Sequence, residues 1–229
     1  MDKSIVIIGH GICGRGVAEQ IVKHQRRGIR IICVDSKEFY EQDTNMPVAL
    51  TWGGSESYKK NSCPQWQLRV KGVDEYRCDV VKNIVRREDG AGLVVELEKS
   101  ADIKADAVVA ATGFTIPIIK PGLGVSWTER KDEIGAFREA VRNAKNIVVA
   151  GSGASGIDMA GDIRLHADVQ GGARVHLITS GKYVLGGSVS ERNRRELTKV
   201  IENAPGMVLH NDRVVGDDFR TPSITKRTI

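Results

Sequence analysis

One motif occurs twice in this chain. Residues 4–21 read SIVIIGHGICGRGVAEQI, and residues 146–163 read NIVVAGSGASGIDMAGDI. Each copy is a short β-branched run, then G-x-G-x-x-G, then a segment with the apolar spacing of an amphipathic helix. The pattern predicts a strand that turns sharply into a helix. Its repetition 142 positions later predicts two such units on one chain.

The three glycines of such a turn have separate tasks. The first adopts a backbone conformation denied to larger residues, the second lets a pyrophosphate approach the main chain, and the third lets the helix pack on the strand. The helix N-terminus then offers free N–H groups and a positive dipole end to phosphates. The alternative is a pair of tight turns in a Rossmann-like fold that binds nothing. The glycines are Gly9, Gly11 and Gly14 in the first copy and Gly151, Gly153 and Gly156 in the second.

The first copy is followed by an acidic residue at the expected place. A second apolar run at 29–34 ends in Asp35, which lies 21 residues beyond Gly14. At this spacing a carboxylate accepts hydrogen bonds from a ribose diol. Strand, glycines, helix, strand and acid are therefore all present in the first unit.

The second copy differs at the corresponding position. Its second apolar run, 173–178, leads into Thr179, Ser180, Gly181 and Lys182, without a carboxylate. A hydroxyl and an ammonium group near this position favour NADP(H) over NAD(H), since nothing repels a 2′-phosphate. The alternative is an ordinary polar strand end with no cofactor preference.

Composition and cysteine spacing narrow the class of protein. The 229 residues are 41% hydrophobic with a net charge of +5, which fits one or two globular domains. The stretch 191–199 has mixed charge and resembles a solvated helix face more than a nucleic-acid arm. None of the four cysteines, at positions 13, 33, 63 and 78, has C-x-x-C or C-x4-C spacing. This argues against a metal site and against a redox disulfide.

The chain lacks a secretory signal and an apolar run of transmembrane length, so we expect a cytoplasmic protein. Peripheral membrane contact and mitochondrial association remain open.

The remaining segments predict a coarse element order. We expect strands at 66–72, 78–87, 92–98 and 107–111, a helix at 129–143, and a βαβαβ series from 147 to 210. Residues 39–63 lack clean periodicity and form either a segment that covers the cofactor or a surface loop with one short helix. Prolines near residue 117 mark a crossing between two domains, 1–116 and 117–229.

This order resembles the pyridine-nucleotide:flavin oxidoreductases with two dinucleotide-binding domains. Within that group the runs VVAATG (108–113) and IVVAGSGASGIDMAGDI are similar to the apoptosis-inducing-factor-like branch, including the ferroptosis-suppressor type, and to type II NADH dehydrogenases. The resemblance implies an α/β fold of the FAD/NAD(P)-binding, Rossmann-like type. Its three layers would be two β-sheets and one layer of helices (ββα). It implies FAD and NAD(P)H as cofactors and a quinone-like electron acceptor as the small-molecule partner.

The resemblance also implies the site residues. The first site would bind the ADP part of FAD with residues of the first glycine turn and residues that follow the second strand. The A-T-G segment at the crossing between the two domains would also lie against FAD. The second site would hold the NAD(P)H pyrophosphate, and Asp158 stands where the branch usually has Glu near the nicotinamide. The FAD residues are Gly9, Gly11, Ile12, Cys13, Gly14, Asp35, Ser36, Lys37, Ala111, Thr112 and Gly113. The NAD(P)H residues are Gly151, Gly153, Ala154, Ser155, Gly156, Asp158, Ser180 and Lys182.

The chain departs from this group at its C-terminus. Members continue with a second crossing, a G-D pair on the flavin ribityl chain and an interface domain. Gly216-Asp217 lacks the strand context of that pair. We therefore expect a C-terminally truncated chain whose second sheet exposes apolar edges.

Three functions are consistent with these observations. The first is an FAD-dependent NAD(P)H oxidoreductase, or its N-terminal portion, with no obligatory catalytic side chain. The second is a non-catalytic flavoprotein module that binds a nucleotide, a nucleic acid or a protein partner. The third is a flavin monooxygenase, which ranks last because the F-x-G-x-x-x-H-x-x-x-[YF] pattern is absent.

Overall fold

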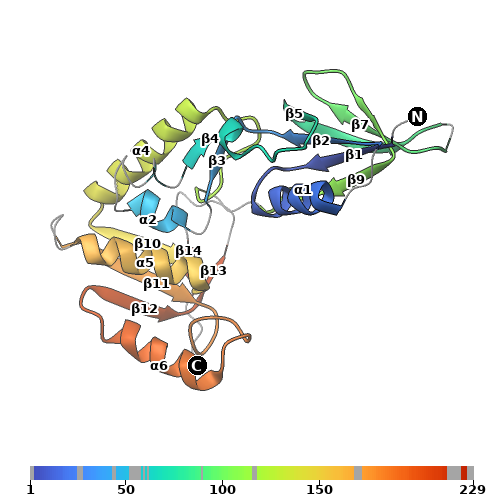
Figure 1. Cartoon of the computed structure of the whole chain (residues 1–229). Helices are drawn as coiled ribbons and strands as arrows, with labels where there is room; N and C mark the ends of the chain where they lie inside the picture. Colours follow the sequence, from blue (N-terminus) through green and yellow to red (C-terminus); the bar gives the residue numbers. More distant parts are fainter. Residues whose placement is uncertain are drawn as a thin grey trace. The chain divides into compact units, whose positions relative to one another are not determined.

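The computed structural model describes residues 3–24, 28–42, 45–51, 58, 60, 62–88, 90–114, 118–167, 172–215 and 223–225 (Figure 1). The chain forms two compact units that interleave in the sequence. The first comprises Met1–Asp43 and Lys59–Glu133, and the second comprises Thr44–Tyr58 and Ile134–Ile229. The proposed division into domains at residues 116 and 117 lies outside the described residues and stays a prediction.

The first unit is organised around a four-stranded parallel sheet with the order β5-β2-β1-β9. Its two central strands, 3–8 and 29–35, are rich in Val and Ile, which suit strands that are buried on both faces of a sheet. The strands and their crossover helix are β1 (Lys3–Ile8), α1 (Ile12–His24), β2 (Ile29–Asp35), β5 (Glu75–Cys78) and β9 (Ala107–Ala110).

A different layer covers each face of this sheet. On one face Ile7, Ile31 and Cys33 pack with Ala18 of α1. On the other face the core continues into an antiparallel sheet with the order β6-β7-β8. Its strands are β6 (Val81–Arg86), β7 (Leu93–Leu97) and β8 (Ile103–Ala105). The expected three-layer ββα arrangement is therefore confirmed in this unit.

The remaining described elements of the first unit are short. An antiparallel pair, β3 (Phe39–Glu41) and β4 (Ser62–Pro64), precedes the 3-10 helix η2 (Gln65–Leu68). The helix α4 (Trp127–Asn143) starts in this unit. At its first turns Arg130 is fully buried and paired with Glu41 of β3, Nε to Oε1, at 2.9 Å.

The second unit contains a three-stranded parallel sheet with the order β10-β11-β12. The helices α5 and α6 pack on one face of it through Ile163, Leu177 and Ile201, among others. The sheet and its helices are β10 (Asn146–Ala150), α5 (Ala154–Ala167), β11 (Arg174–Thr179), α6 (Glu191–Glu202) and β12 (Met207–Asn211). The unit also includes α2 (Met46–Thr51) and an antiparallel pair, β13 (Arg213–Val215) and β14 (Ser223–Thr225).

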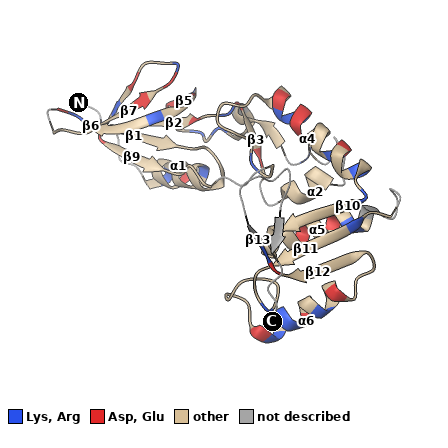
Figure 2. Ribbon diagram, turned by 180° about the vertical axis from the view of Figure 1, so that it is seen from behind, with Lys and Arg blue, Asp and Glu red and all other residues tan. Residues whose placement is uncertain are grey.

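The outer face of α6 has charges of both signs, as expected for residues 191–199 (Figure 2). Ser190 caps the helix by accepting a hydrogen bond from the N–H of Asn193. Lys199 pairs with Glu196, and both side chains are more than half exposed. An alternation of signs on a solvated helix does not create the uniform positive field that nucleic acid requires.

One element prediction from the sequence is wrong, and others differ from the structure in their bounds. The expected strand at 66–72 is largely the helix η2 followed by a turn, although Trp66, Leu68 and Val70 alternate in the sequence as in a strand. The N–H of Val70 donates to Tyr76 Oη instead of to a neighbouring strand. The expected strand at 78–87 merges the end of β5 with β6. The pairs β3-β4 and β13-β14, and strand β8, are additional elements, since strands of three residues have too little periodicity to detect. Gly216 and Asp217 lie outside the described residues.

Asp79 joins the loop after β7 to the end of β5. Its buried carboxylate accepts hydrogen bonds from the N–H groups of Val80, Lys99 and Ser100 and from the Ser100 hydroxyl. Burial alone would raise the pKa of Asp79, but these hydrogen bonds outweigh it and lower the pKa from 3.8 to about 2.

We expect this carboxylate to make stability depend on pH. Because the pKa is lower in the folded chain, the stabilisation is present above about pH 4 and is lost as the pH falls toward 2. The Asp79→Asn variant should be less stable than the parent at pH 7, with a difference that shrinks below pH 4. Urea unfolding at a series of pH values measures this. A difference that stays constant across the series contradicts the prediction.

Candidate dinucleotide-binding sites

The turn between β1 and α1 is closed by two glycines. Gly9 has a φ of +94°, and a Cβ at Gly14 would lie only 1.8 Å from the carbonyl oxygen of Gly9. A Cβ at Gly11 would meet nothing within 4 Å. The first and third glycines therefore close the turn, while the second leaves open space over the main chain. This is the arrangement that the motif predicts for a site approached by a phosphate.

The first amide groups of α1 lie next to that space. The first helical hydrogen bond runs from the N–H of Arg15 to the carbonyl oxygen of Gly11, at 2.9 Å. The N–H groups of Ile12, Cys13 and Gly14 precede it and have no acceptor within the helix. Ile12 and Cys13 are also exposed at this end of the helix. These three residues fit the phosphate-binding role expected for them, which stays a prediction.

The end of β9 packs against the same turn. The N–H of Ala111 donates to the carbonyl oxygen of Ile8 at 2.8 Å, and a Cβ at Gly9 would lie 2.4 Å from the carbonyl oxygen of Ala111. Thr112 and Gly113 follow and are exposed, with Gly113 at a φ of +72°. The structure therefore brings the A-T-G segment next to the first glycine turn, although the two are about 100 residues apart in the sequence.

Asp35 is the last residue of β2, and its carboxylate also forms a hydrogen bond with the first glycine turn. Its Oδ2 accepts a hydrogen bond from the N–H of His10 at 2.6 Å, and its Oδ1 accepts one from the N–H of Lys37 at 2.9 Å. A carboxylate accepts roughly four hydrogen bonds, so this arrangement leaves capacity for a ribose diol. Ser36 and Lys37 lie beside it, half-buried, with the Lys37 ammonium 5.8 Å from the centre of the Phe39 ring.

His10 is a member of this site that the sequence motif does not identify. It occupies a variable position of the motif, yet its side chain is buried, with Nδ1 2.7 Å from Gln65 Oε1. Its ring lies edge-on to that of Tyr76, with centroids 4.9 Å apart. No signal within the motif could have revealed this, since the contacts come from residues 55 and more positions away.

The second turn repeats the geometry of the first. Gly151 has a φ of +106°, and a Cβ at Gly156 would lie 2.0 Å from its carbonyl oxygen. A Cβ at Gly153 would meet nothing within 4 Å. The first helical hydrogen bond of α5 runs from the N–H of Ile157 to the carbonyl oxygen of Gly153, at 3.0 Å. The N–H groups of Ala154, Ser155 and Gly156 therefore have no helical acceptor.

A side-chain contact connects this turn to the end of β11. The hydroxyl of Ser152 donates to Oγ1 of Thr179 at 2.7 Å, and the Ser152 carbonyl oxygen accepts from the N–H of Leu185 at 2.8 Å. Leu185 has a φ of +62°, an unusual conformation for a residue with a Cβ. The segment after β11 therefore folds back against the glycine turn. The motif predicts neither Ser152 nor Thr179 in this structural role.

The polar residues expected to determine the preference between NADH and NADPH lie just beyond the carboxyl end of β11. Ser180 and Lys182 directly follow β11 and are exposed, and the Lys182 ammonium is 5.1 Å from the centre of the Tyr183 ring. Asp158 is exposed in the first turns of α5. These positions are compatible with the roles expected for the three residues, which stay predictions.

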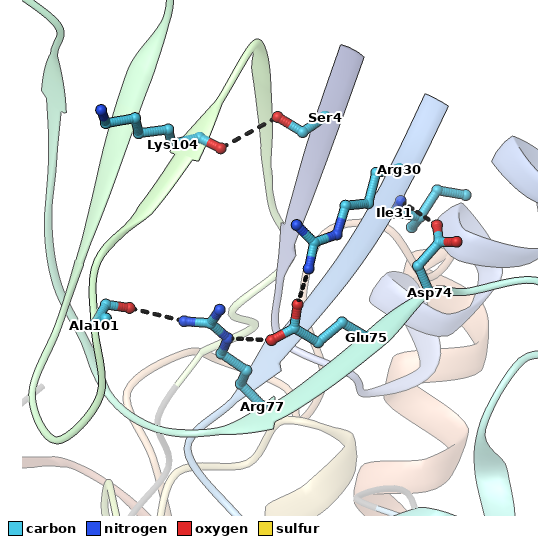
Figure 3. Close-up of polar contacts among 8 residues, drawn as sticks. All are labelled: Ser4, Arg30, Ile31, Asp74, Glu75, Arg77, Ala101 and Lys104. Atoms are coloured by element: carbon cyan, nitrogen blue, oxygen red, sulfur yellow. Dashed lines mark hydrogen bonds and ion pairs between the residues drawn. The ribbon is translucent and has the colours of Figure 1, made fainter. Parts of the chain in front are cut away.

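A separate cavity of about 440 Å³ lies at the other edge of the first unit's parallel sheet, near the amino ends of its strands. There Glu75 accepts hydrogen bonds from Arg30 and Arg77, as Figure 3 shows. Asp102 and Lys104 also line the cavity, which therefore has charged groups of both signs. Because it is remote from the glycine turn, this cavity is not part of the dinucleotide site.

Clustered metal ligands and membrane-spanning helices are not features of the described residues. No group of three His, Cys, Asp or Glu side chains comes together there in a way that could bind a metal ion. Among the helices described, none has both the length and the apolar character needed to cross a membrane.

Comparison with known proteins finds one curated protein that is similar in sequence and many solved structures that are similar in fold. Oxidoreductase ptaL of Pestalotiopsis fici is 26% identical over 196 residues, which cover 80% of this chain and 50% of that protein. The water-forming NADH oxidase of Lactobacillus brevis, solved with NADH, superposes with a TM-score of 0.68 at 16% identity, over 97% of this chain and 50% of that one. The sulfide:quinone oxidoreductase of Aquifex aeolicus superposes with a TM-score of 0.66 at 15% identity. The match covers 94% of this chain and 52% of that one.

These comparisons agree on the fold and on length. The chain spans about half the length of each of these relatives. The structural neighbours confirm the expected Rossmann-like α/β fold. The family description for pyridine nucleotide-disulphide oxidoreductases matches residues 3–222, nearly the whole chain, and the chain therefore belongs to that family.

Proposed function

We propose that this chain provides the FAD-binding and NAD(P)H-binding units of an FAD-dependent NAD(P)H oxidoreductase. The observation that carries the proposal is the repeated turn geometry, in which Gly11 and Gly153 leave open main chain beside amides that have no acceptor within their helix. Membership of the pyridine nucleotide-disulphide oxidoreductase family supports the same function. It does not favour the alternative of a non-catalytic binding module.

The residues of the first unit fit an FAD molecule. The amides of Ile12, Cys13 and Gly14 would bind its pyrophosphate, and Asp35 would accept hydrogen bonds from its adenosine ribose. Thr112 would donate its exposed hydroxyl near the flavin end. Because His10 and Lys37 already donate to the Asp35 carboxylate, its orientation is fixed before the ribose binds.

The residues of the second unit fit the pyrophosphate of NAD(P)H in the same way. The amides of Ala154, Ser155 and Gly156 would bind it, and the contact between Ser152 and Thr179 would keep the turn in place. When bound, the two cofactors supply hydride transfer from the nicotinamide to the flavin. The side chains then have to bind and align the cofactors rather than act as acid or base. We therefore name no catalytic residue.

We further propose a quinone-like acceptor and membership of the apoptosis-inducing-factor-like branch, close to the ferroptosis-suppressor type. All four cysteines are free thiols, which supports electron transfer from the flavin directly to an acceptor rather than through a disulfide. One structural neighbour is named a sulfide:quinone oxidoreductase. Steady-state assays with quinone analogues, a disulfide substrate and oxygen as acceptors test this choice.

The absorbance spectrum of the purified chain, before and after anaerobic NADPH, tests the main proposal. Flavin bands that bleach when NADPH is added are the expected result. A chain that takes up FAD but never bleaches would contradict the oxidoreductase. A chain that binds neither FAD nor NADPH would also contradict the assignment of the two sites.

The thiol of Cys13 offers a direct probe of the first site. Cys13 is exposed at the start of α1, whereas burial raises the pKa of Cys33 to about 12 and makes that thiol unreactive. We expect FAD to slow the alkylation of Cys13 by iodoacetamide at least about tenfold, because the bound pyrophosphate covers it. Peptide mass spectrometry measures labelling at each cysteine. Equal labelling of Cys13 with and without FAD contradicts the assigned site. Alkylation of free N-acetylcysteine with and without FAD is the control, because Cys78 lies beside Asp35 of the same site.

Lys182 should determine the preference for NADPH. Its exposed ammonium follows β11 with Ser180, where a 2′-phosphate would lie. We expect Lys182→Ala to weaken NADPH binding at least about tenfold, because a charge-assisted hydrogen bond contributes about 1.5–3 kcal/mol, and to leave NADH binding unchanged. Titration calorimetry with both nucleotides measures this, with Lys199→Ala on α6 as the matched control. An equal loss for both nucleotides contradicts the prediction.

A further inference from the structure

The sheet of the second unit has a second face, away from α5 and α6. Val175 and Leu177 of β11 point into the helix-covered core. Since side chains alternate along a strand, His176 lies on the opposite face. The register pairs Ile178 of β11 with His210 of β12, so His176 and His210 are diagonal neighbours on that face.

The two imidazole rings are in direct contact. The distance from His176 Nδ1 to His210 Nε2 is 2.9 Å, and the other nitrogen of His176, Nε2, lies 3.4 Å from Asn146 Oδ1. An amide oxygen only accepts hydrogen bonds, so this network assigns the proton of His176 to Nε2. Nδ1 of His176 then accepts a hydrogen bond from the N–H at Nε2 of His210. A metal ion bound by both nitrogens would take the place of this proton, which would move to Nδ1 of His210.

We infer that His176 and His210 together bind a divalent transition-metal ion that places nitrogen ligands at right angles, such as Ni²⁺ or Cu²⁺. A metal–nitrogen bond of about 2.0–2.1 Å separates two nitrogens by about 2.9 Å at a right angle and about 3.3 Å in a tetrahedron. The spacing in this chain matches the former. Water fills the remaining positions, since the described residues provide no cluster with a third His, Cys, Asp or Glu ligand.

Asn146 acts as the positioning residue of this site. Its Oδ1 accepts from the nitrogen of His176 that does not face the ion, which fixes the tautomer and the ring orientation. The three residues come from β10, β11 and β12, so the bound ion would connect neighbouring strands of one sheet. Binding should therefore raise the unfolding temperature of the chain.

Titration calorimetry of the untagged full chain with NiCl₂ tests the inference. We expect one Ni²⁺ per chain, with affinity lost at least about tenfold in His176→Asn and in His210→Asn. His24→Asn, an exposed histidine on α1, is the matched control and should bind like the parent.

A second measurement needs no variant. The electron paramagnetic resonance spectrum of the parent chain with one equivalent of Cu²⁺ should contain coupling to two imidazole nitrogens. A spectrum without that coupling overturns the inference, as does Ni²⁺ binding that survives in both histidine variants. Thermal unfolding without metal first establishes that the variants fold. If they do not, the copper spectrum of the parent decides.

Discussion

Replacing Gly14 by alanine should destabilise the first unit by more than about 3 kcal/mol. The added Cβ would lie 1.8 Å from the carbonyl oxygen of Gly9 and 2.8 Å from its carbonyl carbon. These are backbone atoms, so no side-chain rotation relieves the contact. The turn or α1 would have to move away from β1, and the packing of Ala18 against Ile7 and Ile31 would be lost with it.

Gly11→Ala is the matched control, because the same methyl group is added three residues earlier in the same turn. Its Cβ would meet no atom within 4 Å, so the variant should unfold at nearly the parental urea concentration. The methyl group would nevertheless occupy the space into which a pyrophosphate comes. We therefore expect Gly11→Ala to keep its fold and lose FAD, and Gly14→Ala to lose both.

Urea unfolding followed by circular dichroism, together with flavin absorbance after dialysis against FAD, separates the two effects. The same contrast should hold between Gly156→Ala and Gly153→Ala in the second turn. A Cβ at Gly156 would lie 2.0 Å from the carbonyl oxygen of Gly151, whereas a Cβ at Gly153 would meet no atom within 4 Å. A Gly11→Ala variant that retains FAD as well as the parent does would show that the open space is not the pyrophosphate site.

The two turns could be predicted from the sequence because steric constraints act within a few residues. The spacing of Gly9 and Gly14 predicts that the turn carbonyl contacts the helix, whatever surrounds it. The β-branched runs before each turn predict buried parallel strands for a similar reason. Local sequence patterns were therefore sufficient to predict the fold class and the glycines that close each turn.

Contacts between distant segments could not be predicted in the same way. His10 is buried because Gln65 of η2 and Tyr76 of β5 pack against it. These residues are far from His10 in the sequence, so no local pattern predicts the contacts. The composition of segment 66–72 is apolar enough to predict a strand. It forms η2 and a turn instead, since Tyr76 Oη accepts from the N–H of Val70 and ends any extended pairing there.

A buried ion pair supplies the second large expected effect. Arg130 and Glu41 have fully buried side chains, and Arg130 Nε donates to Glu41 Oε1 at 2.9 Å. The same guanidinium donates to the carbonyl oxygens of Ile118 and Ile119. One side chain of α4 therefore fixes β3 and the segment that follows the A-T-G crossing. No sequence pattern indicates this pair, because 89 residues separate the two partners.

Removing one member of this pair should cost more than removing both. Arg130→Met leaves the Glu41 carboxylate in a buried site without its cation, and we expect a loss of about 3–5 kcal/mol. The double variant Arg130→Met with Glu41→Leu should be more stable than Arg130→Met alone, since it leaves no buried charge without a partner. Glu133, which also pairs with Arg130, is 45% exposed and stays solvated in both variants.

The exposed pair between Arg142 and Glu139 is the matched control on the same helix. Both side chains are more than half exposed, so Arg142→Ala should cost less than about 1 kcal/mol. Urea unfolding of the parent and the three variants measures all the differences. If Arg130→Met costs no more than Arg142→Ala, burial does not raise the cost of breaking the pair. If instead the double variant is less stable than Arg130→Met, the hydrogen bonds of Glu41 contribute more than the penalty for its isolated charge, and the role assigned to Arg130 is wrong.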